Sequence, residues 1–531
     1  MLMTKLNFDG PVVLAILDGI GLAPDGPGNA IGKANTPFLA KATQDYLHTA
    51  LEASGTAVGL LPGVVGNSEV GHKTMGCGQI VKQGIAQIDA AFEDGSIWQS
   101  AAWHDAIQNL KNTKGTLNFA GILSDGGVHS HISHLKQMVE KACKEGIKKI
   151  RIHCIFDGRD VSPQSEPKYI NELETFAFRF PTVDIKIASG GGRMTTVADR
   201  YENDWSMVER GFNMMVHGQS DNVFYSAAEA IETFRQKDPS LQDQYIPDFV
   251  IIDKQKQPVG KVQTGDSFIY FDFRADRAIE ITEAFTDSDF DHFDRGNYSP
   301  GDIFFAGLTE YDSDRHLPEH QLIPPIAIKN ALHSVLGAYH LSELAISETV
   351  KFGHITYYFN GASHEKSLGE NFIEIPSDTR PLNERPWMKS AEITDAVIDN
   401  LAKYKFIRVN YPNGDMVGHL ARINSTRLAI EALDLQLARL ARAVDEHHGC
   451  LVIVSDHGNA EEILDSDGNP KTAHTTNKVP FVIYDNTANR GHYQLANLDQ
   501  SGLANLAATI AELLGLDTYP LDWQPSLITV L

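Results

Sequence analysis

The sequence predicts a mixed α/β protein of two domains, in which a parallel-sheet domain is split along the chain by an inserted second α/β domain. Its 531 residues exceed what one hydrophobic core usually organises. Short apolar runs that end at Gly or Asp alternate with helical stretches, which is typical of parallel α/β sheets. We expect one joint near residues 80–88 and another near 312–325, where the chain is polar and proline-bearing.

These joints divide the chain into three segments. We expect residues 1–82 and 316–531 to form the outer domain, and residues 83–315 to form the inserted domain.

The outer domain contains four predicted buried strands and a long helix. The helix covers residues 424–449, where apolar residues recur at spacings of three and four; Asn424 or Ser425 could cap it and Gly449 could end it. A second covering helix is expected near residues 503–513. The predicted strands lie within residues 11–19, 405–415, 449–459 and 478–485.

The inserted domain repeats the pattern of strands that run into polar loops. A helical stretch over residues 133–146 separates the first two strands. The predicted strands and their loops lie within residues 116–127, 148–160, 183–193 and 266–277.

Composition excludes several classes of partner. The formal net charge of −24 argues against binding nucleic acid or anionic membranes, because both require a basic face. The chain shows no signal-like start and no apolar run long enough to span a bilayer. Four scattered cysteines indicate reduced thiols and a cytoplasmic protein. An anionic small molecule needs only a local basic pocket, so it remains a candidate substrate.

Carboxylates and imidazoles follow the predicted strands of the outer domain. Ligands of open α/β sheets bind at the carboxyl ends of strands, so we expect these groups to meet. Oxygen and imidazole ligands suit Mn, Mg, Co or Zn, and six of them exceed one four-coordinate site, which favours two metals. The alternative is that each histidine is a solvated loop residue. The six candidates are Asp18, Asp415, His419, Asp456, His457 and His474.

The strands of the inserted domain end in basic residues. Guanidinium groups bind carboxylate and phosphate in a bidentate manner, so the pattern indicates a pocket for a small, multiply anionic ligand. The alternative is a set of surface ion pairs with the many Asp and Glu residues. The candidates are His129, Arg159, Asp160, Arg193, Arg200, Arg274 and Arg277.

The motifs of this chain, taken together, are specific. It resembles the cofactor-independent phosphoglycerate mutases of the alkaline phosphatase superfamily over nearly its whole length. The resemblance implies a metal-dependent phosphatase-like domain with an inserted transferase domain. It implies interconversion of 3-phosphoglycerate and 2-phosphoglycerate in glycolysis and gluconeogenesis by a cytoplasmic monomer that needs no 2,3-bisphosphoglycerate. The motifs that carry it are "GNSEVGH", "SDGGVHSH", "DGRD", "FRADR", "DMVGH", "SDHGNAE" and "AHT", in that order.

The resemblance also implies residue roles. Ser68 of "GNSEVGH", which could otherwise be a turn residue, would be the nucleophile that becomes phosphoserine, and Lys351 would contact the phosphoryl group. Asp160 would be the general base, and the basic residues above would bind the glycerate, although "GRMTTVADRYENDW" lengthens the loop around Arg200. Two divalent ions, most often Mn, would be held by Asp18, Ser68, Asp456 and His457, and by Asp415, His419 and His474.

Three other functions compete with this interpretation. A related metal-dependent phosphatase or phosphopentomutase would share the metal ligands but has no obvious need for the arginine pocket. A sulfatase would require a modification motif that "GNSEVGH" does not match. A non-enzymatic acidic metal-binding protein would carry its ligands in an acidic run, whereas here they occupy separate loops around a serine.

Overall fold

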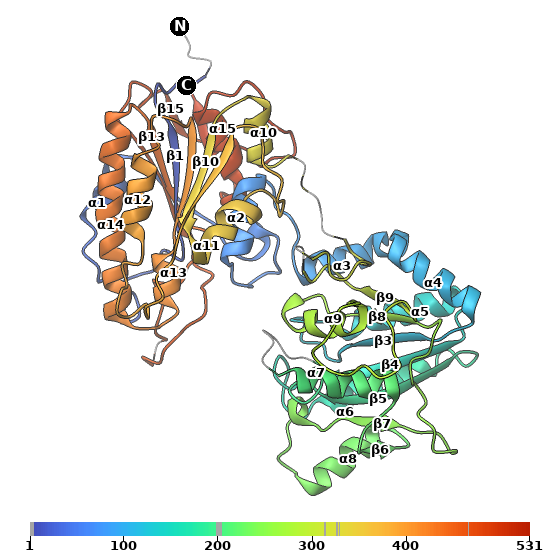
Figure 1. The fold of residues 1–531 in the computed structure, drawn as a ribbon. Coiled ribbons are helices and arrows are strands. Elements are labelled where there is room, and N and C mark those ends of the chain that lie inside the picture. Colours follow the sequence, from blue (N-terminus) through green and yellow to red (C-terminus); the bar gives the residue numbers. More distant parts are fainter. Residues whose placement is uncertain (1–4, 198–203, 313–314, 325–327, 329, 466) are drawn as a thin grey trace. The chain divides into compact units, whose positions relative to one another are not determined.

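The computed structural model describes residues 5–197, 204–312, 315–324, 328, 330–465 and 467–531. The chain forms two compact units (Figure 1). The outer unit comprises Met1–Gln83 and Ala327–Leu531, and the inserted unit comprises Gly84–Ile326.

The second joint lies after Ile326, at the far end of the region near 312–325 where we expected it and beyond the boundary drawn between residues 315 and 316. Gly307 donates its N–H to the carbonyl of His320 at 3.0 Å, which pairs this segment with the end of a strand of the inserted unit. Leu322 and Ile323 are buried in the core of the same unit. Hydrogen bonding and apolar burial therefore hold this proline-bearing stretch in the inserted unit.

The outer unit is built on a seven-stranded sheet, and all four expected strands are present in it. The sheet order is β11-β10-β12-β1-β13-β14-β2. Neighbouring strands run parallel, except that β14 is antiparallel to both of its neighbours, β13 and β2. The bounds are Glu370–Ile375 (β11), Glu343–Glu348 (β10), Phe406–Tyr411 (β12), Val12–Leu17 (β1), Cys450–Val454 (β13), Val479–Asp485 (β14) and Leu47–Leu51 (β2).

Helices cover both faces of this sheet (Figure 1). Val12, Leu14 and Ile16 of β1 pack with α2, α10 and α15, whereas the residues between them pack with α1, α12 and α14. This period-two alternation, with both faces apolar, is expected of a strand buried in a parallel sheet. The bounds are Pro37–Asp45 (α1), Ser68–Cys77 (α2), Leu332–Ala338 (α10), Thr349–Gly353 (α11), Ser390–Ile398 (α12), Asn413–Gly418 (α13), Ile423–Glu446 (α14) and Leu506–Leu513 (α15).

The long helix α14 is present, but the expected cap is wrong. Its N-cap is Arg422, without a side-chain hydrogen bond, so Asn424 and Ser425 lie inside the first turn. The helix ends at Glu446, and the N–H of Gly449 bonds to the carbonyl of Val444 at 3.0 Å. The helix therefore begins at Ile423, before the predicted caps, and its first buried residue is Thr426.

The inserted unit contains a second seven-stranded sheet, with the order β6-β7-β5-β4-β3-β8-β9. The four central strands β5, β4, β3 and β8 are the expected ones, and they run parallel to one another. The bounds are Val223–Phe224 (β6), Phe249–Ile251 (β7), Asp184–Gly192 (β5), Lys149–Phe156 (β4), Leu117–Ile122 (β3), Ser267–Tyr270 (β8) and Phe304–Gly307 (β9).

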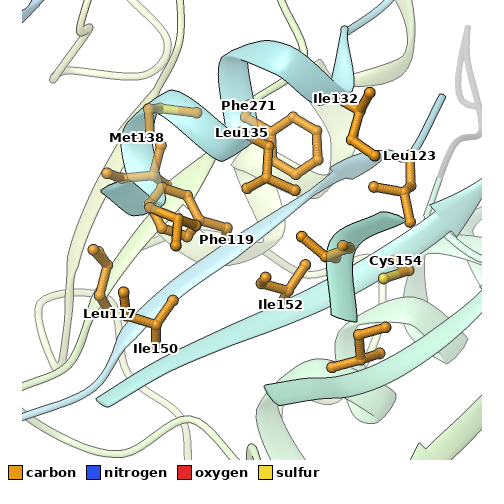
Figure 2. Close-up of a cluster of buried hydrophobic side chains, with 14 of the residues drawn as sticks. Leu117, Phe119, Leu123, Ile132, Leu135, Met138, Ile150, Ile152, Cys154 and Phe271 are labelled. Carbon is orange, nitrogen blue, oxygen red and sulfur yellow. The ribbon is translucent and has the colours of Figure 1, made fainter. Parts of the chain in front are cut away.

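The core of the inserted unit joins its sheet to the expected helix α5. Figure 2 shows Leu135 and Met138 of this helix over Leu117 and Phe119 of β3. Helices α3, α4, α5, α6 and α8 share this core, while α7 and α9 pack on the other face. The bounds are Ile85–Glu93 (α3), Ala101–Thr113 (α4), Ile132–Lys144 (α5), Glu166–Ala177 (α6), Trp205–Phe212 (α7), Ala227–Lys237 (α8) and Ile279–Thr286 (α9).

The four cysteines are free. Among the described residues, we find no helix with the length and apolar character needed to cross a bilayer.

A buried ion cluster ties three strands of the outer sheet together. Arg408 of β12 is fully buried and contacts Glu343 of β10, and its Nη2 donates to Glu370 of β11 at 2.7 Å. Burial raises the pKa of Glu343 to about 7. Burial alone would raise the pKa of Glu370 as well, but hydrogen bonding from His333 and the charge of Arg408 lower it to about 2. Both carboxyl groups therefore depend on one guanidinium.

Replacing Arg408 with Met should destabilise the outer unit strongly. The change strands two buried carboxyl groups without a cation, which costs about 3–5 kcal/mol of unfolding free energy. Arg439→Met is the matched control, because Arg439 forms a largely exposed pair with Asp395 and should contribute at most about 1 kcal/mol. Urea unfolding followed by circular dichroism measures both variants. Equal midpoints for the two would contradict a structural role for the cluster.

Candidate active site

Charged side chains gather at one edge of the outer sheet. Asp18 directly follows β1, Asp456 lies two residues after β13, and Asp415 lies in α13, after β12. All three side chains are buried. These strands are adjacent and parallel, so their carboxyl ends share an edge. His474 precedes β14, and because β14 runs antiparallel to β13, its start lies at the same edge. The reversal of one strand thus brings a fourth loop to the cluster.

Ser68 lies in the first turn of α2, within this cluster. The side chain of Asn67 caps the helix by accepting the N–H of Val70 at 2.9 Å. The Ser68 hydroxyl is buried, donates to Asp18 Oδ1 at 3.2 Å and lies 3.0 Å from His457 Nε2. A helix N-terminus favours negative charge, so this position suits an alkoxide or a phosphoryl group.

Lys351 is the cation of the cluster. Its ammonium donates to Ser68 Oγ, to Asp18 Oδ1 at 3.0 Å and to Asp415 Oδ2 at 2.7 Å. Burial disfavours its charge, but the charges of Asp18 and Asp415 overcome burial and raise its pKa. Lys351 therefore remains positive and points its charge at the serine oxygen.

The three histidines predicted as metal ligands share one orientation. In each of them Nδ1 faces a backbone carbonyl. The distance is 2.6 Å from His419 to Thr472, 2.8 Å from His474 to Gly66 and 3.3 Å from His457 to Gly458. Each Nδ1 therefore donates its proton, so Nε2 is the nitrogen that would bind a cation. The Nε2 atoms of His419 and His474 both lie 3.1 Å from Asp415 Oδ1, as the spacing of "DMVGH" predicted for His419.

These residues fit divalent cations. Asp18, Asp415 and Asp456 place three buried carboxylates around the single ammonium of Lys351. Burial and the charge of Asp456 raise the pKa of Asp18, which is the sign of negative charge in excess. The hydrogen bond to Asp415 raises the pKa of His419, so positive charge is favoured there too. Among the residues that the structure describes, two triads have ligand atoms within 4.8 Å of one another: Asp18, Asp456 and His457, and Asp415, His457 and His474.

The structure thus brings all seven expected metal ligands together with Lys351. His457 belongs to both triads, and the division of ligands between two ions stays a prediction.

In the inserted unit, the predicted pocket residues follow four adjacent parallel strands. The strand order β5-β4-β3-β8 puts the carboxyl ends of these strands at one edge. His129 follows β3, Arg159 and Asp160 follow β4, Arg193 follows β5, and the "FRADR" arginines follow β8.

Arg193 organises the centre of this edge. It is buried, and its Nη1 donates to Asp157 at 2.7 Å and to Asp160 at 2.6 Å. Its Nη2 lies 2.7 Å from His129 Nε2. Because a guanidinium can only donate, His129 accepts at Nε2 and is neutral. Burial and the charge of Arg193 lower the pKa of His129 to about 4, which agrees with that assignment.

The other predicted arginines differ in exposure. Arg159 and Arg274 are exposed, and Arg274 Nε lies 3.2 Å from Asp276, as in the ion-pair alternative. Arg277 is buried. The position predicted for Arg200 lies outside the described residues. The structure therefore assembles His129, Asp160 and Arg193 and leaves Arg159 and Arg274 open to solvent.

Asp157 is a residue of this edge that the sequence did not single out. Its Oδ1 accepts the backbone N–H of Asp160 at 3.0 Å as well as Arg193, and its Oδ2 accepts Ser124 at 2.7 Å. Although burial alone would raise the pKa of Asp157, these hydrogen bonds and the charge of Arg193 lower it. The first Asp of "DGRD", at the end of a strand, was the available signal.

The outer unit sets a serine among carboxylates and imidazoles at a sheet edge, and the inserted unit holds the buried Arg193 between two carboxylates. These features are those of a metal-dependent phosphotransferase of mixed α/β fold. Residues 88–313 match the family described as "BPG-independent PGAM N-terminus (iPGM_N)". The chain belongs to the family of 2,3-bisphosphoglycerate-independent phosphoglycerate mutases, because relatives with that name match it over nearly its whole length.

Three relatives illustrate the match. A probable mutase of this kind from Leptospira interrogans is 44% identical, and the match covers 97% of each chain. The Trypanosoma brucei brucei enzyme is 40% identical over 98% of this chain and 97% of its own. The structure is similar to the crystal structure of Leishmania mexicana phosphoglycerate mutase at low cobalt concentration, with a TM-score of 0.71. The two sequences are 39% identical, and the match covers 100% of this chain and 99% of the Leishmania mexicana chain. The family and the fold class expected from the motifs are confirmed.

The low pKa of His129 predicts how stability depends on pH. Between pH 6.5 and 4 the unfolded chain binds a proton at His129 that the folded chain does not, so its contribution to stability is lost as the pH falls through this window. His129→Gln cannot titrate. Between pH 7 and pH 4.5 the variant should therefore lose less unfolding free energy than the wild type, by roughly 2–3 kcal/mol.

Urea unfolding at the two pH values, in the presence of a chelator, measures this difference. His104→Gln on the surface of α4 is the control and should keep the wild-type pH dependence. Parallel losses in wild type and His129→Gln would refute the assignment of a neutral, buried His129.

Proposed function

We propose that this chain interconverts 3-phosphoglycerate and 2-phosphoglycerate through a phosphoserine on Ser68, without 2,3-bisphosphoglycerate. The family membership supports the reaction, and one contact carries the mechanism. The buried ammonium of Lys351 donates to Ser68 Oγ at the N-terminus of α2, next to Asp18 and His457. A serine that only shaped a turn would not need a buried cation on its oxygen.

Two divalent cations complete the proposal. Mn²⁺ is our first choice over Mg²⁺, Co²⁺ and Zn²⁺, because carboxylate and imidazole ligands dominate the site. When bound, such ions lower the pKa of the serine hydroxyl and neutralise phosphoryl charge. Their proposed ligands are Asp18, Ser68, Asp456 and His457 for one ion, and Asp415, His419 and His474 for the other.

Lys351 and α2 stabilise the charge that develops in the first step. Deprotonated Ser68 Oγ attacks the phosphorus of 3-phosphoglycerate, and the bond from phosphorus to the 3-oxygen breaks. The proton that Ser68 loses balances the proton that the 3-oxygen takes up, and glycerate remains. The Lys351 ammonium stabilises the alkoxide before attack and a phosphoryl oxygen afterwards. The first amide groups of α2 act in the same sense.

Residues of the inserted unit hold the glycerate and promote the second step, in which the phosphoryl group passes from Ser68 to the 2-oxygen. Asp160, oriented by Arg193, takes the proton of the 2-hydroxyl as general base. That oxygen then attacks the phosphoserine, and the bond from phosphorus to Ser68 Oγ breaks. The exposed Arg159 and Arg274 are available to bind the carboxylate. The complete proposed set is His129, Arg159, Asp160, Arg193, Arg200, Arg274 and Arg277.

The same proposal extends to the setting of the enzyme. We place it in glycolysis and gluconeogenesis, in the cytoplasm, as a monomer that binds neither nucleic acid nor membranes. The formal net charge of −24 supports the exclusion of nucleic acid and membranes, and the four free cysteines support a cytoplasmic location.

Ser68→Ala should abolish mutase activity without unfolding the protein. Removing a catalytic nucleophile costs several orders of magnitude in kcat, whereas one hydroxyl contributes only about 1 kcal/mol to stability. The assay supplies Mn²⁺ and 3-phosphoglycerate, omits 2,3-bisphosphoglycerate and couples the product to enolase. Mass spectrometry of acid-quenched wild type should find phosphate on the peptide that contains Ser68.

Ser96→Ala, at an exposed serine of the inserted unit, is the control and should keep wild-type turnover. Bound metal must be measured alongside, because Ser68 is also a proposed ligand. Near-normal turnover by Ser68→Ala with metal fully bound would exclude the phosphoserine route.

Arg159→Ala should weaken catalysis and leave metal binding intact. Loss of a charge-assisted contact to glycerate should lower kcat/KM roughly 30- to 150-fold, which corresponds to about 2–3 kcal/mol. Metal content should not change, because Arg159 belongs to the inserted unit and the metal ligands belong to the outer unit. Arg179→Ala, at an exposed arginine 3.8 Å from Glu140, is the control. Loss of metal from Arg159→Ala would contradict the two separate assignments.

A further inference from the structure

Glu461 is a buried carboxylate to which the proposed function assigns no role. It closes the motif "SDHGNAE" after β13 and is 1% exposed. Within the part of the chain that the structure describes, no lysine, arginine or histidine lies within ion-pair distance of it. A buried carboxylate without a cation is costly unless hydrogen bonds satisfy both oxygens.

Four hydrogen bonds satisfy Glu461. Oε2 accepts the N–H of Gly21 at 2.9 Å and that of Asn459 at 2.8 Å. Oε1 accepts the side-chain amide of Asn477 at 3.0 Å and the hydroxyl of Thr475. The donors come from three loops, which follow β1, follow β13 and precede β14.

Each of these loops carries a proposed metal ligand close to its donor. Asp18 lies three residues before Gly21, His457 lies two residues before Asn459, and His474 directly precedes Thr475. A bridge between Gly458 and Thr475 joins the second loop to the third, with a bond from the N–H of Thr475 to the carbonyl of Gly458 at 3.0 Å. The Glu461 carboxylate therefore links the three loops that carry Asp18, His457 and His474.

The chain leaves room for this carboxylate at two glycines. A Cβ on Gly21 would lie 2.3 Å from the Glu461 carboxyl carbon, and one on Gly458 would lie 2.3 Å from Oε1. Both contacts are far shorter than van der Waals distance, so only glycine permits the approach. Asn459, whose backbone bonds to Glu461, extends the connection by donating its side chain to Asp415 at 3.1 Å.

We propose that Glu461 is a positioning residue for the metal centre. It fixes the positions, relative to one another, of the loops that carry Asp18, His457 and His474. This inference rests on the proposed function, because it takes those three side chains as ligands. Residues that orient metal ligands typically contribute 10- to 100-fold in metal affinity.

Glu461→Gln tests the role with little change of shape. The amide keeps one acceptor oxygen, but its NH₂ group meets two of the four donors and loses their hydrogen bonds. The variant should bind Mn²⁺ 10- to 100-fold more weakly, measured as free Mn²⁺ by electron paramagnetic resonance during titration. Excess Mn²⁺ should restore kcat largely to the wild-type value, because no group that touches the substrate has changed.

Two further variants separate position from charge. Glu462→Gln is the matched control. The Glu462 carboxylate is partly exposed, pairs with Lys471 and accepts the Asn477 amide at the long distance of 3.4 Å, so the change should not affect Mn²⁺ affinity. Thr475→Val keeps the charge of Glu461 and deletes one donor, so it should also weaken Mn²⁺ binding, by a smaller factor. It also remains informative if Glu461→Gln does not fold.

The outcomes are distinct. Unchanged Mn²⁺ affinity in Glu461→Gln, with or without lower thermal stability of the metal-free protein, would overturn the inference. Weaker binding by Glu461→Gln with no change in Thr475→Val would assign the effect to charge and would also overturn it. If the wild type neither binds Mn²⁺ nor forms product, the proposed function fails first.

Discussion

Three carboxylates buried around a single ammonium impose a charge constraint on the whole outer unit. Asp18, Asp415 and Asp456 are removed from water, and Lys351 neutralises only one of the three charges. Desolvating charges is tolerated only where opposite charge and hydrogen bonds compensate. The unit must therefore present further positive charge or cation ligands at this one edge, and the loops, the helix N-terminus and the histidines all meet that requirement.

The architecture meets the constraint with backbone geometry. Adjacent parallel strands deliver Asp18 and Asp456 to the same edge, and a single turn of α13 sets His419 beside Asp415. Carbonyl groups, such as that of Gly66 on His474, then fix which ring nitrogen faces the carboxylates. The inserted unit solves a similar problem differently, because Arg193 holds Asp157, Asp160 and His129 together by donating to each of them.

Sequence reasoning reached the features that local pattern encodes. Apolar runs located the central strands, and the four-residue spacing within "DMVGH" located the pair of Asp415 and His419. It missed features that depend on tertiary partners. Alternation along β14 carries no information about its direction, and α14 begins before Asn424, at a position that no capping side chain marks. Asp157 and Glu461 were overlooked because their importance lies in donors contributed by distant segments.

The insertion also has a consequence for the order in which the chain can fold during synthesis. Val12 of β1 pairs with Phe406 of β12 and Cys450 of β13. Strand β1, at the centre of the outer sheet, therefore cannot pair until partners about 400 residues further along the chain have been synthesised. At 5–20 residues per second, the ribosome needs roughly 20–80 s to supply the first of them. The inserted unit is complete well before then and is free to fold. Throughout that interval β1, apolar on both faces, has two unpaired edges, so it needs protection from aggregation by chaperones.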